Sequence, residues 1–122
     1  MRSAAVLPAR LRASLVELLG EDVDDVEIVA NSWYARLHFG ARATTRRNRI
    51  LLPGAAEDFL ADPALVLHEY FHVLRQWNPG RMSVGSYLWE WLRRGYWRNR
   101  YERQARRFVG LRLGALRQRL DA

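Results

Sequence analysis

The pattern of apolar and polar residues predicts several helices and a few short strands. Apolar side chains recur at helical spacing along residues 7–19 and again along 100–120, which is typical of helices with one buried face. Runs of strand-forming residues at 26–30, 41–45 and 49–52 predict strands, the last two paired as a hairpin across an arginine-rich turn. Four further helices are predicted over residues 33–37, 55–60, 63–77 and 83–94. This order predicts an α+β fold, mostly helical, with a β-hairpin or a three-stranded antiparallel sheet segregated from the helices.

The helix predicted over residues 63–77 has the clearest boundaries. Asp62 and Pro63 form a start signal, because an aspartate side chain caps free backbone N–H groups and proline is favoured at the first helical position. Trp77-Asn78-Pro79-Gly80 forms the stop signal. One side of the helix is apolar, and the histidines share the other side with Arg75 and Gln76; the apolar side is formed by Val66, Leu67, Tyr70, Phe71, Val73, Leu74 and Trp77. We therefore expect a core helix that also carries polar chemistry.

Within this helix, His68-Glu69-Tyr70-Phe71-His72 has the pattern H-E-x-x-H. Side chains four residues apart on a helix are separated by about 40°, so both imidazoles can bind one metal ion. Glu69 lies beside that face, where it can reach a water molecule rather than the metal. The alternative is a core helix whose two histidines are satisfied by neighbouring side chains, but burying them without a partner is costly. The pattern therefore predicts a Zn²⁺ site with His68 and His72 as ligands and Glu69 as general base.

A catalytic zinc site needs a third protein ligand, and the chain contains no cysteine. The acidic residues after the motif helix are Glu90, Glu102 and Asp121, the last of which is expected to fray. Glu90 lies in an aromatic segment, and the alternative to metal binding is that its carboxylate forms an ion pair with a nearby arginine. Glu102 lies in the first turn of the last predicted helix, and the alternative to metal binding is that it forms a capping box with Asn99. The residues by themselves leave Glu102 and Glu90 open, with a slight preference for Glu102.

Three segments resemble a known family of minimal zincins. These are Gly40-Ala41-Arg42-Ala43-Thr44-Thr45, Ile50-Leu51-Leu52-Pro53 and Leu65-Val66-Leu67-His68-Glu69-Tyr70-Phe71-His72-Val73. Together they resemble the small metallopeptidase-like domains known as DUF4157, which are often associated with extracellular contractile injection systems. The resemblance extends over roughly residues 24–108 and includes Gln76, near the family's glutamine positions. It implies a zincin-like fold and a gluzincin-type zinc metallopeptidase.

The resemblance also bears on the third ligand and on the turn between the two strands. In similar small zincins the third ligand is the glutamate of an N-x-y-E-x-x-A segment, which Asn99-Arg100-Tyr101-Glu102-Arg103-Gln104-Ala105 resembles. This implies that Glu102 is the third ligand. Arg46-Arg47-Asn48-Arg49 departs from the family, because a small, glycine-bearing turn is usual at this place.

The predicted reaction is zinc-dependent hydrolysis of a peptide or protein substrate by a zinc-activated water. In zincin-like folds an edge strand lies above the motif helix and takes a peptide by strand addition. The candidate strand consists of Ala41, Arg42, Ala43, Thr44 and Thr45, whose alternative role is an ordinary edge strand protected by arginine. An oxyanion-stabilising group is also required, for which Tyr96, Tyr101 and His38 are candidates.

Length and hydropathy bear on domain number and location. A chain of 122 residues with 49% hydrophobic content can bury one modest core, so we expect a single domain over residues 1–122. No run of about 18 apolar residues is present, and the first ten residues do not have the pattern of a signal peptide. We therefore expect no membrane partner and a cytoplasmic location, or export by a route that the sequence does not reveal.

The net charge of +7 is unevenly distributed. Residues 81–122 contain 11 arginines and three acidic residues, a net charge of +8, which leaves −1 for residues 1–80. An arginine-rich nucleic-acid binder is therefore one alternative function, with Trp97 and Tyr101 available for base stacking. The helical spacing of Tyr101 and Phe108 favours packing instead. A second alternative is a zincin-fold binding or assembly module whose zinc is not catalytic.

Overall fold

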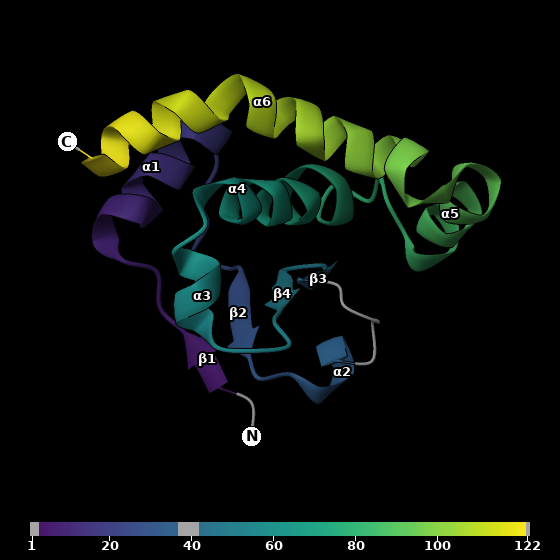
Figure 1. Ribbon diagram of the computed structural model, residues 1–122, viewed down its shortest axis with the longest axis horizontal. Helices are drawn as coiled ribbons and strands as arrows, with labels where there is room; N and C mark the ends of the chain where they lie inside the picture. The colour runs from purple at the N-terminus through teal and green to yellow at the C-terminus, as the bar shows by residue number, and fades with distance from the viewer. Residues whose placement is uncertain (1–2, 37–41, 122) are drawn as a thin grey trace.

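The computed structural model describes residues 3–36 and 42–121. Helices make up most of the described chain and a small sheet lies beneath them, so the predicted α+β class is confirmed (Figure 1). The elements in chain order are β1 (Ser3–Ala5), α1 (Ala9–Leu19), β2 (Glu27–Ala30), α2 (Trp33–Arg36), β3 (Thr44–Arg46), β4 (Arg49–Leu51), α3 (Ala56–Leu60), α4 (Pro63–Phe71), the π-helix η1 (His72–Trp77), α5 (Val84–Arg98) and α6 (Arg100–Asp121).

The sheet has four strands in the order β1-β2-β4-β3. The outer pairs, β1 with β2 and β3 with β4, are antiparallel. The β3–β4 hairpin was predicted, whereas β1 was not. The prediction of an entirely antiparallel sheet is wrong for the central pair, because β2 and β4 run parallel with Ile28 opposite Ile50. The chain leaves β2 through α2 and enters β3 at the far edge, so the β3–β4 hairpin returns β4 beside β2. Apolar periodicity reveals that a strand has a buried face but not the direction of its neighbour.

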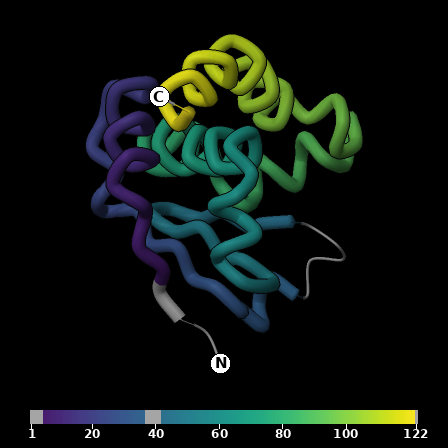
Figure 2. The backbone as a smooth tube through the Cα atoms, turned by 60° about the vertical axis from the view of Figure 1, so that its left-hand side comes forward, coloured from purple at the N-terminus to yellow at the C-terminus, as the bar shows by residue number. Residues whose placement is uncertain are grey.

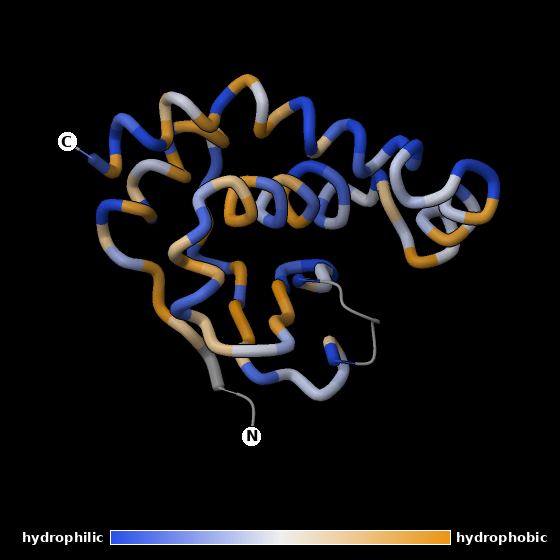
Figure 3. The backbone as a smooth tube through the Cα atoms, viewed as in Figure 1, coloured by the Kyte–Doolittle hydropathy of each residue, from blue (hydrophilic) through white to orange (hydrophobic). Residues whose placement is uncertain are grey.

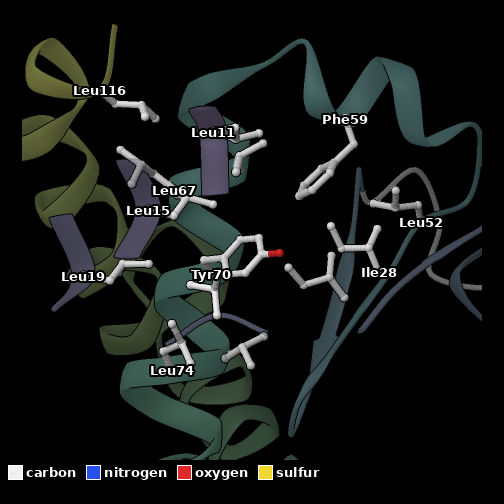
Figure 4. Close-up of a cluster of buried hydrophobic side chains, with 14 residues drawn as sticks. Leu11, Leu15, Leu19, Ile28, Leu52, Phe59, Leu67, Tyr70, Leu74 and Leu116 are labelled. Atoms are coloured by element: carbon white, nitrogen blue, oxygen red, sulfur yellow. The ribbon is translucent and has the colours of Figure 1, made fainter. Parts of the chain in front are cut away.

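The core lies between the sheet and the helices, with α4 at its centre. Figure 2 shows α4 running between the sheet and α6, and Figure 3 shows that the two central strands consist largely of apolar residues. Leu67 and Tyr70 on α4 are fully buried, and they meet Ile28 from β2 and Leu116 from α6 (Figure 4). Burial of each such leucine contributes about 1.5–3 kcal/mol. This packing fixes the orientation of α4 and therefore of its histidines.

The predicted motif helix is two segments, because the α-helix changes to a π-helix at His72. Asp62 caps its start through a bond from the Leu65 N–H to Oδ1, as predicted. At the other end, the Asn78 N–H bonds the Val73 carbonyl five residues earlier, at 2.8 Å. π-Helical turns are rare and are found frequently at functional sites. The wider turn changes which side chains face inward, and Gln76, predicted on a polar face, is buried at 1% exposure.

Gly95 determines how α5 connects to α6. It interrupts α5 with φ 74° and ψ 175°, a left-handed φ that glycine adopts without the steric cost of a side chain. The predicted break at this glycine is confirmed, although helical structure resumes after it as far as Arg98. The turn brings α6 back across α4 (Figure 1), so that the start of α6 lies near the motif.

Candidate metal centre

Three side chains from α4, η1 and α6 converge on one point. Glu102 Oε1 lies 2.9 Å from His68 Nε2 and 2.9 Å from His72 Nε2, and the two nitrogens are 3.1 Å apart. The imidazole rings meet at 75° with centroids 4.7 Å apart. Ligands at the usual 2.0–2.1 Å from a tetrahedral zinc ion lie roughly 3.3 Å from one another, which is close to this spacing. Two imidazole nitrogens and a carboxylate oxygen are also ligand types that zinc prefers.

The Gln76 side chain determines which nitrogen of His72 carries a proton. Gln76 Nε2 donates to the Tyr101 carbonyl at 3.0 Å and to Gln104 Oε1 at 2.9 Å, so Gln76 Oε1 must be the atom that faces His72. His72 Nδ1 lies 2.6 Å from this oxygen and therefore donates to it. In a neutral His72 the other nitrogen, Nε2, then has a lone pair that points at Glu102 Oε1. Two acceptors at hydrogen-bond distance require a cation between them, either a proton or a metal ion.

The electrostatics of this centre favour a bound cation. Burial by itself opposes a charged His72, but the hydrogen bond and negative charge of Glu102 outweigh it and raise the pKa of His72. Burial also opposes a charged Glu102, yet hydrogen bonds with His68 and His72 lower the pKa of Glu102 well below its ordinary range. The carboxylate is therefore ionised at neutral pH although Glu102 is only 5% exposed.

Glu69 lies beside this centre and faces the cleft. Its Oε1 is 3.8 Å from His68 Nε2, which is longer than the distances that Glu102 makes. Ligand atoms of His68, Glu69 and His72 lie within 4.8 Å of one another, a group that could hold a metal ion. Burial raises the pKa of Glu69, although the nearby charges of His72 and His68 oppose this shift. Glu102 is therefore the carboxylate closer to His68, and Glu69 lies at the margin of the centre.

Tyr87 is a member of the site that the sequence did not reveal. Its hydroxyl donates to Glu102 Oε2 at 2.7 Å, and this bond holds the carboxylate with Oε1 toward the histidines. Burial and the charge of Glu102 raise the pKa of Tyr87, so the hydroxyl keeps its proton. No spacing rule connects Tyr87 to a glutamate fifteen positions later, because the contact arises only from the turn between α5 and α6. Gln76 is part of the resemblance to the minimal zincins, but the sequence assigned it no contact or role.

The structure places the two candidate third ligands differently. Glu90 is 5% exposed, like Glu102, but its Oε1 accepts a bond from the Arg100 N–H at 3.2 Å at the start of α6. Asn99 also caps this helix, since its Oδ1 accepts from the Tyr101 N–H at 2.9 Å. The capping box considered for Glu102 is wrong, because both oxygens of Glu102 contact the histidines and Tyr87 instead.

The centre opens into a cleft of about 1020 Å³ between β3 on one side and α5 on the other. Arg42, Ala43, Thr44 and Thr45 of the predicted substrate strand line the cleft, and β3 lies at an edge of the sheet. Ala41 and His38 lie outside the described residues. Tyr96 lines the cleft, and burial together with the charge of Glu102 raises its pKa.

Tyr101 does not fit the role of oxyanion stabiliser that its sequence position suggested. Its side chain is 3% exposed, and its hydroxyl accepts a bond from Arg100 Nη2 at 2.7 Å. Its ring stacks on Tyr87 with centroids 6.3 Å apart, and it does not line the cleft. Tyr96 is therefore the better placed of the two tyrosines.

Among the described residues, none of the helices has the length and apolar content required to cross a membrane.

Comparison with models of known protein families finds a match to the eCIS core domain over residues 6–80. The matched region includes strands β2, β3 and β4, helix α4 and the H-E-x-x-H motif, whereas β1, Tyr87 and Glu102 lie outside it. Neither the curated proteins nor the solved structures gave a match.

Proposed function

This chain belongs to the eCIS core domain family, and we propose that it is a zinc-dependent peptidase. The observation that supports this most strongly is the convergence of His68 Nε2, His72 Nε2 and Glu102 Oε1 within 3.1 Å of one another. Gln76 orients His72 so that a lone pair, and not an N–H group, faces this point when the ring is neutral. We infer that these three side chains are the zinc ligands.

Each remaining polar group near the centre has a role in hydrolysis under this proposal. Bound zinc supplies a Lewis acid that polarises the scissile carbonyl and lowers the pKa of a water to about 7. Glu69 accepts the proton of the attacking water and delivers it to the leaving amine, a task for which its raised pKa is suited. Tyr96 keeps its proton and donates to the oxyanion from the cleft wall. Tyr87 holds Glu102 in place.

The cleft has a place for a peptide backbone. Among the described strands, β3 pairs only with β4, and its residues line the cleft, so the other edge of β3 has no strand partner. A substrate in an extended conformation would add to this edge and lie across the histidines. The small side chains Ala43 and Thr44 permit the close approach that strand addition requires, and the Trp77 indole N–H holds Thr45 Oγ1 at 3.0 Å.

The test combines metal analysis with proteolysis. We expect the purified protein to contain one zinc ion, and to cleave a broad peptide library only when zinc is present. Glu69→Gln should keep the zinc and lose cleavage by about 10²–10⁴-fold, because it removes the base but not a ligand. Glu57→Gln, an exposed position on α3, is the matched control and should cleave normally.

Two outcomes would contradict the proposal at different points. A protein without zinc, whose stability a chelator does not change, would exclude the metal centre. Zinc bound at one equivalent, with no cleavage of any peptide, would retain the centre and assign it to a binding or assembly module with non-catalytic zinc.

A further inference from the structure

Helix α5 exposes an unusual amount of apolar surface. Its fifteen residues include three tryptophans, and one side of it, which we call the α5 apolar arc, consists of residues that are each about half exposed or more. The arc is formed by Val84, Leu88, Trp89, Trp91 and Leu92, at 48%, 51%, 61%, 48% and 71% exposure. At 100° per residue these positions span roughly 160° of the helix surface. A contiguous apolar surface of this kind marks a site of interaction.

The proposed substrate cleft explains only one part of this arc. Val84, Leu88 and Trp91 line the cleft, so a bound peptide would cover them. Trp89 and Leu92 do not line it, and they are the two most exposed members of the arc. The opposite side of α5 is anchored in the protein through Glu90, which is 5% exposed and bonds the first N–H of α6. Binding of a peptide in the cleft therefore does not account for the exposure of Trp89 and Leu92.

The exposed charges of residues 81–120, which include α5, all have the same sign. Between residues 81 and 120 the two acidic residues, Glu90 and Glu102, are buried, so every exposed ionised side chain in this region is an arginine. Arg93, Arg94 and Arg98 lie on α5 itself, and the Arg93 guanidinium lies 5.9 Å from the centre of the Trp89 ring. The surface that α5 itself contributes is thus apolar and cationic, without an exposed carboxylate.

We propose that the Trp89–Leu92 side of α5 docks on an anionic lipid surface. Helices that bind the membrane interface combine tryptophan and leucine with flanking arginines, because the apolar groups enter the acyl boundary while the arginines contact phosphates. Tryptophan is also enriched at this depth, where one part of the ring is apolar and the N–H is hydrated. The helix lies on the membrane and does not span it.

Two other occupants fit the same surface less well. A nucleic acid would use the arginines and the tryptophan rings, but it offers no apolar interior for Leu92, which is the most exposed large aliphatic side chain of α5. A second copy of the chain, docked arc to arc, would bring Arg93, Arg94 and Arg98 of both copies together without exposed acidic partners. Docking on lipid is independent of the proposed peptidase activity, because neither Trp89 nor Leu92 touches the cleft.

The experiment is sedimentation of the zinc-loaded full chain with lipid vesicles. We expect binding to vesicles of phosphatidylcholine mixed with phosphatidylglycerol, weakening as salt increases, and little binding to phosphatidylcholine alone. Leu92→Ser should weaken binding about tenfold. Leu111→Ser is the matched control, since Leu111 is 65% exposed on α6, and it should change binding less than twofold, on the order of experimental error. Arg93→Ser should weaken binding roughly fivefold.

Several results would overturn the proposal. No sedimentation with anionic vesicles would exclude it, and equal losses in Leu92→Ser and Leu111→Ser would show that α5 is not the contact. Binding that is lost in Arg93→Ser, retained in Leu92→Ser and displaced by a single-stranded oligonucleotide would assign the surface to nucleic acid. A dimer in sedimentation equilibrium without lipid, dissociated by Leu92→Ser, would assign it to a second copy. Circular dichroism melts confirm that each variant is folded.

Discussion

Replacing Glu102 by glutamine tests the metal centre with the smallest change in shape. The carboxylate has two separate partners, since Oε1 lies 2.9 Å from both imidazole nitrogens and Oε2 accepts from the Tyr87 hydroxyl at 2.7 Å. Glutamine keeps the size of the side chain but removes its charge. It also places an amide NH₂ at one of the two positions, where it can neither bind a cation nor accept the tyrosine proton.

The expected loss of zinc affinity can be bounded from below. Partners that merely orient a ligand contribute 10–100-fold to metal affinity, and Glu102 lies as close to the imidazole nitrogens as a ligand does. We therefore expect Glu102→Gln to weaken zinc binding by at least about a hundredfold, or about 2.7 kcal/mol. The zinc-free protein should also lose at least about 1.5–3 kcal/mol of its free energy of unfolding, because the variant loses at least one hydrogen bond to a charged group and each such bond contributes about this much.

Glu90→Gln is the matched control for this measurement. Glu90 is as buried as Glu102 and lies in the neighbouring helix, but its carboxylate caps α6 and does not contact the histidines. Zinc affinity is measured by competition with a chromophoric chelator, and stability by denaturant unfolding in a chelator. Zinc binding by Glu102→Gln that equals the unsubstituted protein, or an equal loss in Glu90→Gln, would refute the assignment of Glu102.

Three further predictions concern the groups around the histidines. Gln76→Met should weaken zinc binding about 10–100-fold in the same competition assay, because His72 loses the acceptor that orients it; an unchanged affinity would remove Gln76 from the site. Tyr87→Phe should weaken zinc binding less, by about 3–10-fold, since it frees one oxygen of Glu102 without removing the charge; a loss as large as that of Glu102→Gln would contradict this. The stability that the raised pKa of His72 gives the zinc-free protein is fully present below its unfolded pKa of about 6.5 and is lost as pH rises through the folded value. The lowered pKa of Glu102 gives stability that is present above its unfolded pKa of about 4.3 and is lost as pH falls. Denaturant unfolding in the presence of chelator should therefore show the greatest free energy of unfolding between about pH 4.3 and pH 6.5, and a decline at higher pH. Added zinc should abolish this decline. A free energy of unfolding that rises steadily with pH in chelator would contradict the prediction.

Local sequence was sufficient for several features that depend on neighbours in the same element. Asp62 and Pro63 predicted the start of α4 because capping involves groups within one turn. His68 and His72 were predicted to converge because their separation of four residues is close to one helical turn. Gly95 was predicted as a break, and it has a left-handed φ. The positions of β2 and β4 were also predicted, and β3 overlaps the end of its predicted range, 41–45. Strand β1 was not predicted, nor was the parallel pairing of β2 with β4, because pairing joins distant segments.

Features that depend on how one helix crosses another could not be predicted from the sequence. Glu90 and Glu102 are acids of equal burial on adjacent helices, and only the turn at Gly95 and the course of α6 over α4 place Glu102 against the histidines. The approach of Tyr87 to Glu102 has the same origin. The π-helical turn at residues 72–77 was also not predicted.

Local sequence and tertiary packing also contribute differently to α5. The sequence indicated that its tryptophans lie in an aromatic helical segment. In the structure Trp89 and Leu92 are exposed, because the buried contacts of this helix come from its other side. Spacing along one helix thus determined the positions of His68, His72 and Glu69 relative to one another. The third ligand candidate, its tyrosine partner and the exposed apolar arc were decided by tertiary structure, since the angle between packed helices depends on the summed packing of the whole core and not on any single segment.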